Sequence, residues 1–240
     1  MDLFQDLFDP YERKARIYPA LIIILPTLVA TYCLFPYLRD FLSAALSSIF
    51  FLGITYFLGK FSRQVGKRKQ DTLITKWRGM PSERFLRHSD STVDEHTKKR
   101  YHQYLSVHVP NLVIPTPQEE SADPAAADTI YRSSVKWLLN KTRDTQKYKL
   151  LYQDNISYGF TRNLWAMKPL GLTLNSAVFF GSVFLMYKKY NFEVKAVPPE
   201  VWLSFAVTII ITFFLVFLTE ETVHSKAKAY ARTLLEVCDE

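Results

Sequence analysis

Residues 169–187 read PLGLTLNSAVFFGSVFLMY and contain no Asp, Glu, Lys or Arg. The same is true of residues 17–38, 41–59 and 201–219. A helix needs about 20 mainly apolar residues to cross a hydrocarbon core about 30 Å thick, and each run has close to that length. Four such runs in a chain of 240 residues favour four transmembrane helices over buried helices of a soluble protein.

The basic residues set the expected orientation of these helices. Residues 60–168 hold 20 Lys and Arg against 11 Asp and Glu, and many of the basic residues lie beside the apolar runs. Short loops and helix ends that are rich in Lys and Arg stay on the cytosolic side of a membrane. The pattern therefore places the central segment and both tails in the cytosol, and only the loop at residues 188–200 argues weakly against it.

The predicted fold class is an all-α integral membrane protein, with two transmembrane hairpins flanking an α-helical cytosolic insertion. Residues 17–59 form the first hairpin, 60–168 a basic cytosolic helical domain, and 169–219 the second hairpin. Residues 1–16 are expected to form a cytosolic amphipathic segment and 220–240 a cytosolic helix. Acidic residues stand where a secretory signal would be basic, so we expect the first helix to be retained.

Several helix boundaries in the cytosolic part can be read from capping residues. Asp123 before Pro124 predicts a helix over residues 124–141. Ser82 is expected to cap a short helix, and Thr92 with Glu95 fits a capping box.

An apolar seam runs along the C-terminal tail and consists of Val223, Ala227, Tyr230, Leu234 and Val237. This seam fits either self-association or packing against the chain's own helices.

Polar side chains inside the apolar runs are candidates for a pore lining, because such residues normally face protein or water. The candidates are Thr27, Thr31, Asn175, Thr208 and Thr212. Two alternatives remain open. The hydroxyls beside Pro26 would satisfy carbonyls that the proline leaves free, and the amide of Asn175 would form an interhelical hydrogen bond. The small-residue pairs Ser43/Ser47, Ala44/Ser48 and Ala177/Gly181 predict close helix packing, within the chain or with another.

An aromatic and basic cluster in TKWRGMPSERFLRH, residues 75–88, is the candidate cytosolic ligand site. Its members are Trp77, Arg78, Arg84, Arg87 and His88. Arginine matches phosphate groups and aromatic rings stack on bases, so a nucleotide or nucleic acid is the expected kind of ligand. The alternative is that these residues contact lipid headgroups at the membrane surface.

The stretch DNISYGFTRNLWAMKP, residues 154–169, is interpreted as the junction where the cytosolic chain enters the membrane. Its hinge or interface candidates are Gly159, Arg162, Asn163, Trp165 and Lys168. Glycine weakens a helix by about 1 kcal/mol relative to alanine. A glycine at position 159 therefore suggests close helix packing or a hinge.

No pattern for catalysis is found in the sequence. There is no phosphate-binding glycine loop, nucleophile elbow or zinc motif, and Cys33 and Cys238 suggest neither a disulfide nor a metal site. Arg84 and His88 are too close in sequence for the Arg-x4–6-His motif of HEPN-type ribonucleases. We therefore expect no enzyme, no cofactor and no metal. An enzyme acting on lipid or RNA through residues 84–90 is the least favoured alternative.

In layout alone, the chain resembles small multi-pass membrane effectors of bacterial antiphage defence systems. That resemblance implies a non-enzymatic oligomer in the bacterial inner membrane that permeabilises or depolarises it after a cytosolic signal. The expected partners are the lipid bilayer, further copies of the chain, a cytosolic protein, and a nucleotide or nucleic acid. The alternative is a membrane anchor or scaffold that recruits a cytosolic partner protein or a nucleic-acid-binding complex.

Overall fold

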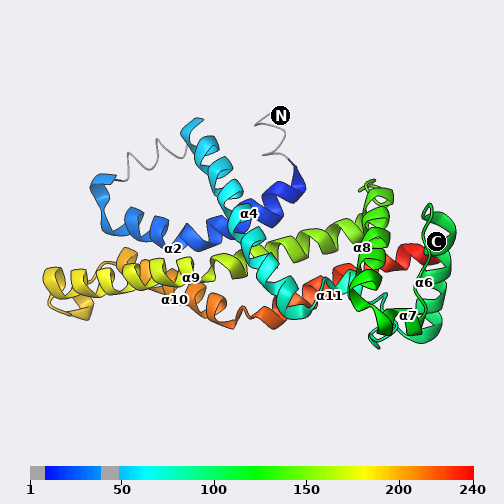
Figure 1. Cartoon of the computed structure of the whole chain (residues 1–240). Coiled ribbons are helices and arrows are strands. Elements are labelled where there is room, and N and C mark those ends of the chain that lie inside the picture. Colours follow the sequence, from blue (N-terminus) through cyan, green and yellow to red (C-terminus); the bar gives the residue numbers. More distant parts are fainter. Residues whose placement is uncertain (1–8, 39–48) are drawn as a thin grey trace. The chain divides into compact units, whose positions relative to one another are not determined.

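The computed structural model, shown in Figure 1, describes residues 9–38 and 49–240. Every regular element in these two ranges is helical, which confirms the all-α class. The chain forms two compact units. Unit 1 comprises Met1–Lys69 and Gly159–Thr222, and unit 2 comprises Gln70–Tyr158 and Val223–Glu240.

Unit 1 contains the apolar helices. A short π-helix, η1 (Glu12–Ile17), leads without a break into α2 (Tyr18–Leu34), and the 3-10 turn η2 (Pro36–Leu38) follows. The helices α4 (Ile49–Trp77) and α9 (Lys149–Tyr190) each contribute residues to both units. A connection containing η3 (Val194–Ala196) joins α9 to α10 (Pro199–Phe217).

Three helical stretches of the described chain are long and apolar enough to cross a membrane: Glu12–Leu34, Lys149–Tyr190 and Pro199–Phe217. They contain the third predicted span, 169–187, and most of the first and fourth, 17–38 and 201–219. The second predicted span, 41–59, lies partly outside the described residues, and its pairs Ser43/Ser47 and Ala44/Ser48 lie wholly outside them. The described part of this span belongs to α4, which continues into the polar sequence beyond it.

The three candidate spans pack around one apolar cluster. Ala20 and Ile23 of α2, Met167 of α9 and Leu215 of α10 are all buried in it. Gly171 lets the helices approach closely, since a Cβ there would lie 2.6 Å from Ile23 Cδ1 and 2.8 Å from Leu215 Cδ1. Close approach at a glycine is a common way for membrane helices to pack.

Gly181, the glycine predicted to pack closely in the third span, is not in close contact with another helix of the described chain. A Cβ built on Gly181 would meet no atom of the described chain within 4 Å, and Gly181 and Ala177 are both exposed. The predicted close packing at this pair is therefore absent within the described chain. Contact with another chain stays a prediction.

Unit 2 contains short helices around a second apolar core. They are α5 (Pro81–Arg84), α6 (Glu95–His108), α7 (Pro117–Ala122), α8 (Pro124–Lys141), α11 (Glu220–Glu236), which begins in unit 1, and η4 (Val237–Asp239). The core is built around fully buried side chains of α6, α8 and α11, such as Leu105, Leu138 and Leu234. Four of the five residues of the tail seam are buried and Tyr230 is half-buried, which favours packing against the chain's own helices.

Two of the expected helix starts are wrong and one is confirmed. Residue 82 is not the cap of α5, which begins at Pro81 because proline suits the first helical position. The cap of α6 is Asp94, whose carboxylate accepts from Thr97 N at 2.9 Å, so the Thr92 capping box is absent. Asp123 caps α8 as expected, accepting from Ala126 N at 3.0 Å.

Candidate functional site

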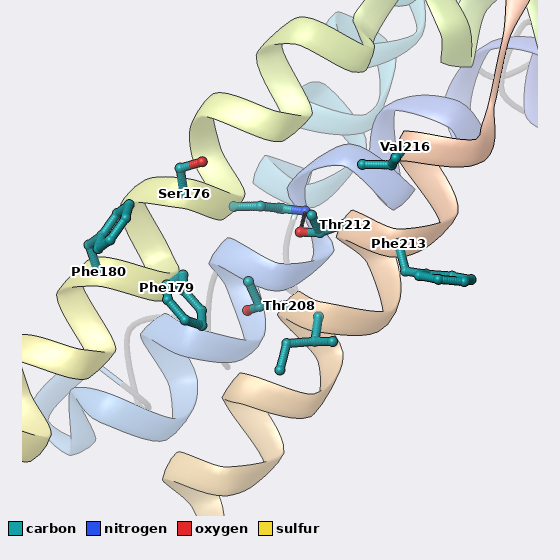
Figure 2. A pocket seen from close by; sticks show the side chains of 9 residues that line it. Ser176, Phe179, Phe180, Thr208, Thr212, Phe213 and Val216 are labelled. Atoms are coloured by element: carbon teal, nitrogen blue, oxygen red, sulfur yellow. Dashed lines mark hydrogen bonds between the residues drawn. The ribbon is translucent and has the colours of Figure 1, made fainter. Parts of the chain in front are cut away.

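The apolar helices of unit 1 carry polar side chains on the inside and large apolar side chains on the outside. Asn175 of α9 and Thr208 of α10 are 1% and 2% exposed, whereas Phe180 and Phe213 are 68% and 65% exposed. Figure 2 shows Thr208 and Thr212 between the two helices, with Phe213 pointing away from them. A soluble helix pair has the reverse distribution, so this one suits helices whose outer surface meets lipid.

Asn175 makes the polar contact that joins α9 to α10. Its Nδ2 donates to Thr212 Oγ1 at 2.9 Å, which is the interhelical hydrogen bond considered from the sequence. Its Oδ1 is buried and accepts no hydrogen bond from any described residue. A buried acceptor without a donor costs about 1–3 kcal/mol of folding free energy, so the free Oδ1 of Asn175 lowers the stability of the fold.

More polar groups lie on the inner faces of the same helices. Within the described chain, the buried hydroxyls of Thr27, Ser182 and Ser204 also have no hydrogen-bond partner. Thr208 donates to the carbonyl of Ser204 at 2.8 Å. Residues spaced by four or seven lie along one helix face. We call the following set the polar seam: Thr27, Asn175, Ser182, Ser204, Thr208 and Thr212.

The five predicted pore-lining residues fall into two grooves. Asn175, Thr208 and Thr212 line a groove of about 450 Å³ between α9 and α10, the one drawn in Figure 2. Thr27 and Thr31 line a second groove of about 470 Å³ between α2 and α9. The structure thus divides the predicted lining between two sides of α9.

The residues of the second groove also test the proline explanation. Pro26 lies inside α2, and the hydroxyl of Thr31 donates to the carbonyl of Thr27 at 2.8 Å. A proline frees the carbonyl four residues before itself, so the bond made by Thr31 does not satisfy it. The hydroxyl of Thr27 likewise bonds no group among the described residues.

Three of the predicted ligand residues lie in unit 2: Trp77 ends α4, Arg78 follows it, and Arg84 ends α5. Trp77 is buried and stacks on His224, with ring centroids 4.6 Å apart. Arg84 donates to the Trp77 carbonyl and to the Asp90 carboxylate, at 3.0 Å in each case. Arg78 is exposed with a φ of 57° and ends the helix. These contacts tie Trp77 and Arg84 into unit 2, and their ligand role stays a prediction.

The other two ligand candidates border a groove of about 400 Å³. Arg87 is clamped by both carboxylate oxygens of Asp128, at 2.7 and 2.5 Å. His88 Nε2 lies 2.9 Å from the carbonyl of Pro115. Glu120 lines the same groove and was not predicted from the sequence. The groove therefore combines one arginine, one imidazole and one carboxylate, and each of them already has a partner.

Glu120 is the centre of a buried hydrogen-bond network. Its carboxylate accepts from Tyr131 Oη at 2.6 Å, from His88 N at 2.8 Å, and from the amide and hydroxyl of Ser89 at 3.1 and 2.8 Å. Burial alone would raise the pKa of Glu120, but these donors lower it to about 2. The carboxylate is therefore ionised at neutral pH and organises the loop after α5.

His102 lies beside this network. Its ring is 4.8 Å from the ring of His88 and it is 8% exposed, with Nε2 2.7 Å from the carbonyl of Leu86. Burial, together with the nearby charges of His88 and Lys98, lowers the pKa of His102. Residues 9–38 and 49–240 contain no group of three side chains that could hold a metal ion.

The junction residues are brought together in unit 1. Asn163 is fully buried, and its Nδ2 donates to the carbonyl of Ala15 at 2.6 Å. Its Oδ1 accepts from Nε and Nη2 of Arg162, at 3.1 and 3.0 Å. A Cβ on Gly159 would lie 2.9 Å from Tyr11 Oη and 3.0 Å from Ala15 Cβ, so this glycine packs closely against the N-terminal helix, which is one of the two alternatives for it, and its role as a hinge stays a prediction.

Lys168 and Trp165 occupy the same stretch of α9. Lys168 Nζ donates to the carbonyls of Val216 and Leu218, at 2.9 and 3.0 Å, and so caps the end of α10. The ammonium group of Lys69 lies 6.0 Å from the ring centroid of Trp165. Both residues therefore hold helices together at the charged end of the apolar segment.

Comparison with protein-family models, with curated protein sequences and with solved structures found no match to this chain.

Proposed function

We propose that the protein is a non-enzymatic, oligomeric membrane effector that permeabilises or depolarises the bacterial inner membrane after a cytosolic signal. In this proposal four helices cross the membrane as two hairpins. Residues 60–168 and both termini lie in the cytosol. The signal is a partner protein or a charged ligand such as a nucleotide, received by the basic cytosolic residues.

The polar seam is the observation that carries this proposal. It places six hydroxyl or amide groups on the inner faces of three apolar helices, and four of them have buried oxygens without a hydrogen-bond partner in the described chain. Polar groups at membrane depth usually mark a route for water or ions. Separation of these helices would give the free oxygens water to bind and would open such a route.

The exposed small residues support self-association. Gly181 and Ala177 leave open space on α9, and this side of the helix lines the groove that also contains Thr27 and Thr31. Without bulky side chains, another helix can approach the backbone closely. A second copy of the chain would supply such a helix, and the oligomer would enclose a path that one copy leaves open to lipid.

A membrane-potential dye in expressing bacteria tests the proposal. We expect depolarisation when the wild-type chain is activated, and none from variants Asn175→Leu and Thr208→Val, because both remove polar groups from the seam. Ser176→Ala is the matched control, since Ser176 is exposed beside Asn175 and donates only to its own helix at Leu172 O. An unchanged potential in cells that contain intact wild-type oligomers would refute an effector that permeabilises the membrane.

A second candidate function is a membrane anchor that recruits a cytosolic partner. An aromatic and basic patch on α6 and α8 favours it, with His108 and Lys141 exposed and Tyr104 and Trp137 half-buried. Lys141 Nζ lies 4.7 Å from the ring centroid of Tyr104 and 5.5 Å from that of Trp137, and the ring of His108 stacks on Tyr104 at 4.1 Å. Aromatic side chains beside a positive charge are common in protein interfaces, and the charge suits an acidic partner.

The two candidates differ in what they require. An anchor needs the patch and tolerates a changed seam, whereas an effector needs the seam. In a pull-down from the native host, Trp137→Ala with Lys141→Ala would lose a specific partner under the anchor function, and Asn175→Leu would keep it. Loss of function only in the Asn175 variant would exclude the anchor as the main role.

A further inference from the structure

Four arginines from three helices gather at the charged end of α2. Arg13 and Arg16 lie one turn apart in η1, Arg63 lies in α4 and Arg162 lies in α9. Arg16 interacts electrostatically with both Arg63 and Arg162. All four belong to unit 1. We call them the arginine cluster.

Arg16 lies among charges of both signs. Glu12 forms an ion pair with Arg16, and Asp9 is the other carboxylate that interacts with Arg16. Arg162 is buried, and the neutral amide of Asn163 accepts two of its N–H groups. Arg63 and Arg162 therefore act on Arg16 as like charges, and like charges at close range repel one another.

The cluster also offers buried hydrogen-bond donors. Nε of Arg13 and Nε of Arg16 are buried and donate to no group in the described residues. The side chain of Arg16 is only 12% exposed. A buried charged donor without an acceptor is costly, and a bound anion would remove that cost. An acceptor with several oxygens fits best, because each guanidinium presents a fork of N–H groups.

We infer that the arginine cluster binds a phosphate group, supplied by the headgroup of an anionic phospholipid or by free phosphate. The lipid source is favoured because the cluster lies where a membrane-spanning helix meets its charged flank. The phosphate would pair with Arg13 and Arg16 and offset the repulsion from Arg63 and Arg162. This site needs no permeation by the protein, so it goes beyond the proposed function.

Thermal unfolding of the full chain in a neutral detergent tests this site. We expect phosphatidylglycerol to raise Tm by about 5 °C, as a ligand that binds only the folded chain does. Phosphatidylcholine, whose phosphate is balanced by its own cation, should leave Tm unchanged. An equal rise with inorganic phosphate would support the site and assign it to free phosphate; no such rise would assign it to the lipid headgroup.

Charge-matched variants distinguish a specific phosphate site from non-specific electrostatic attraction. Arg13→Gln should lose most of the rise in Tm, whereas Lys14→Gln should keep it, since Lys14 is exposed next to Arg13 in sequence. If Arg13→Gln does not fold, Arg63→Gln gives the same comparison from an exposed position. No rise with either source of phosphate, or equal losses in the Arg13 and Lys14 variants, would overturn the inference.

Discussion

Gly66 of α4 lies directly against the side chain of Asn163 of α9. A Cβ on Gly66 would lie 1.8 Å from Asn163 Oδ1 and 2.8 Å from its Cγ. The amide is not free to turn away, because it donates to the carbonyl of Ala15 and accepts from Arg162. One buried amide therefore joins η1, α4 and α9 where the apolar segments begin.

Replacement of Gly66 by alanine should destabilise unit 1. Overpacking a tight contact costs about 1–3 kcal/mol, which outweighs the gain of about 1 kcal/mol in helix propensity. Gly53→Ala is the control, because a Cβ there would meet no described atom within 4 Å. Thermal unfolding in detergent should show a lower Tm for Gly66→Ala and an equal or higher Tm for Gly53→Ala. Equal shifts in the two variants would show that the contact is not tight.

Gly159 should be the position where the junction tolerates least change. Leucine there would push against Tyr11 and Ala15 and separate η1 from α9. We expect Gly159→Leu to lose both assembly and membrane depolarisation, while Gly181→Leu keeps the fold of the single chain. Size-exclusion chromatography with the potential assay measures both effects. Unchanged assembly and activity in Gly159→Leu would mean that residues 154–169 only mark where the chain enters the membrane and do not transmit a signal.

The sequence predicts three of the apolar helices well, because the length and apolarity that crossing a membrane requires are summed over about 20 residues. The start of α8 was also predictable, since Asp123 and Pro124 act on the helix next to them. Thr92 was misleading because Asp94, two residues later, also offers a side-chain acceptor and takes the cap. Sequence rules for helix capping do not show which of two nearby polar residues will cap the helix.

The partners of the charged residues were not predictable. Arg87 is clamped by Asp128, 41 positions away, and Glu120 bonds Tyr131 and the loop at His88 and Ser89. Only the folded chain brings these groups together, so the sequence showed the basic residues without their acceptors. The same holds for Asn163, whose role depends on Ala15 in a distant helix.

Glu120→Gln should lower the stability of unit 2 by about 2–3 kcal/mol, because it removes a charged acceptor from several donors. The pKa of Glu120 is about 2 when folded, against about 4.3 in an unfolded chain. Its contribution is therefore complete above about pH 5 and is lost as the pH falls toward 2. Denaturant unfolding from pH 7 to pH 3 should show this loss in the wild type and a flatter profile in Glu120→Gln. Ser121→Ala, exposed in the same groove, should behave as the wild type.

His102 should make unit 2 less stable in mild acid. Its pKa is lowered by burial, so the unfolded chain binds a proton more readily than the folded chain. The free energy of unfolding should then fall as the pH drops below about 6.5, the value for an unperturbed histidine. His102→Gln keeps a donor toward Leu86 and should reduce this slope between pH 7.5 and pH 5. His96→Gln, at an exposed position, should retain it; equal slopes in all three proteins would contradict the assignment.

Ion flux from liposomes that contain the purified chain tests the proposed effector most directly. Potassium release is measured for folded, oligomeric wild type, Asn175→Leu and Ser176→Ala, with and without added nucleotide or nucleic acid. If the protein is a permeabilising effector, we expect release by the wild type and by Ser176→Ala, and release at the protein-free background by Asn175→Leu. Equal release by Asn175→Leu and the wild type, or none from folded wild-type oligomers under any of these conditions, would contradict it.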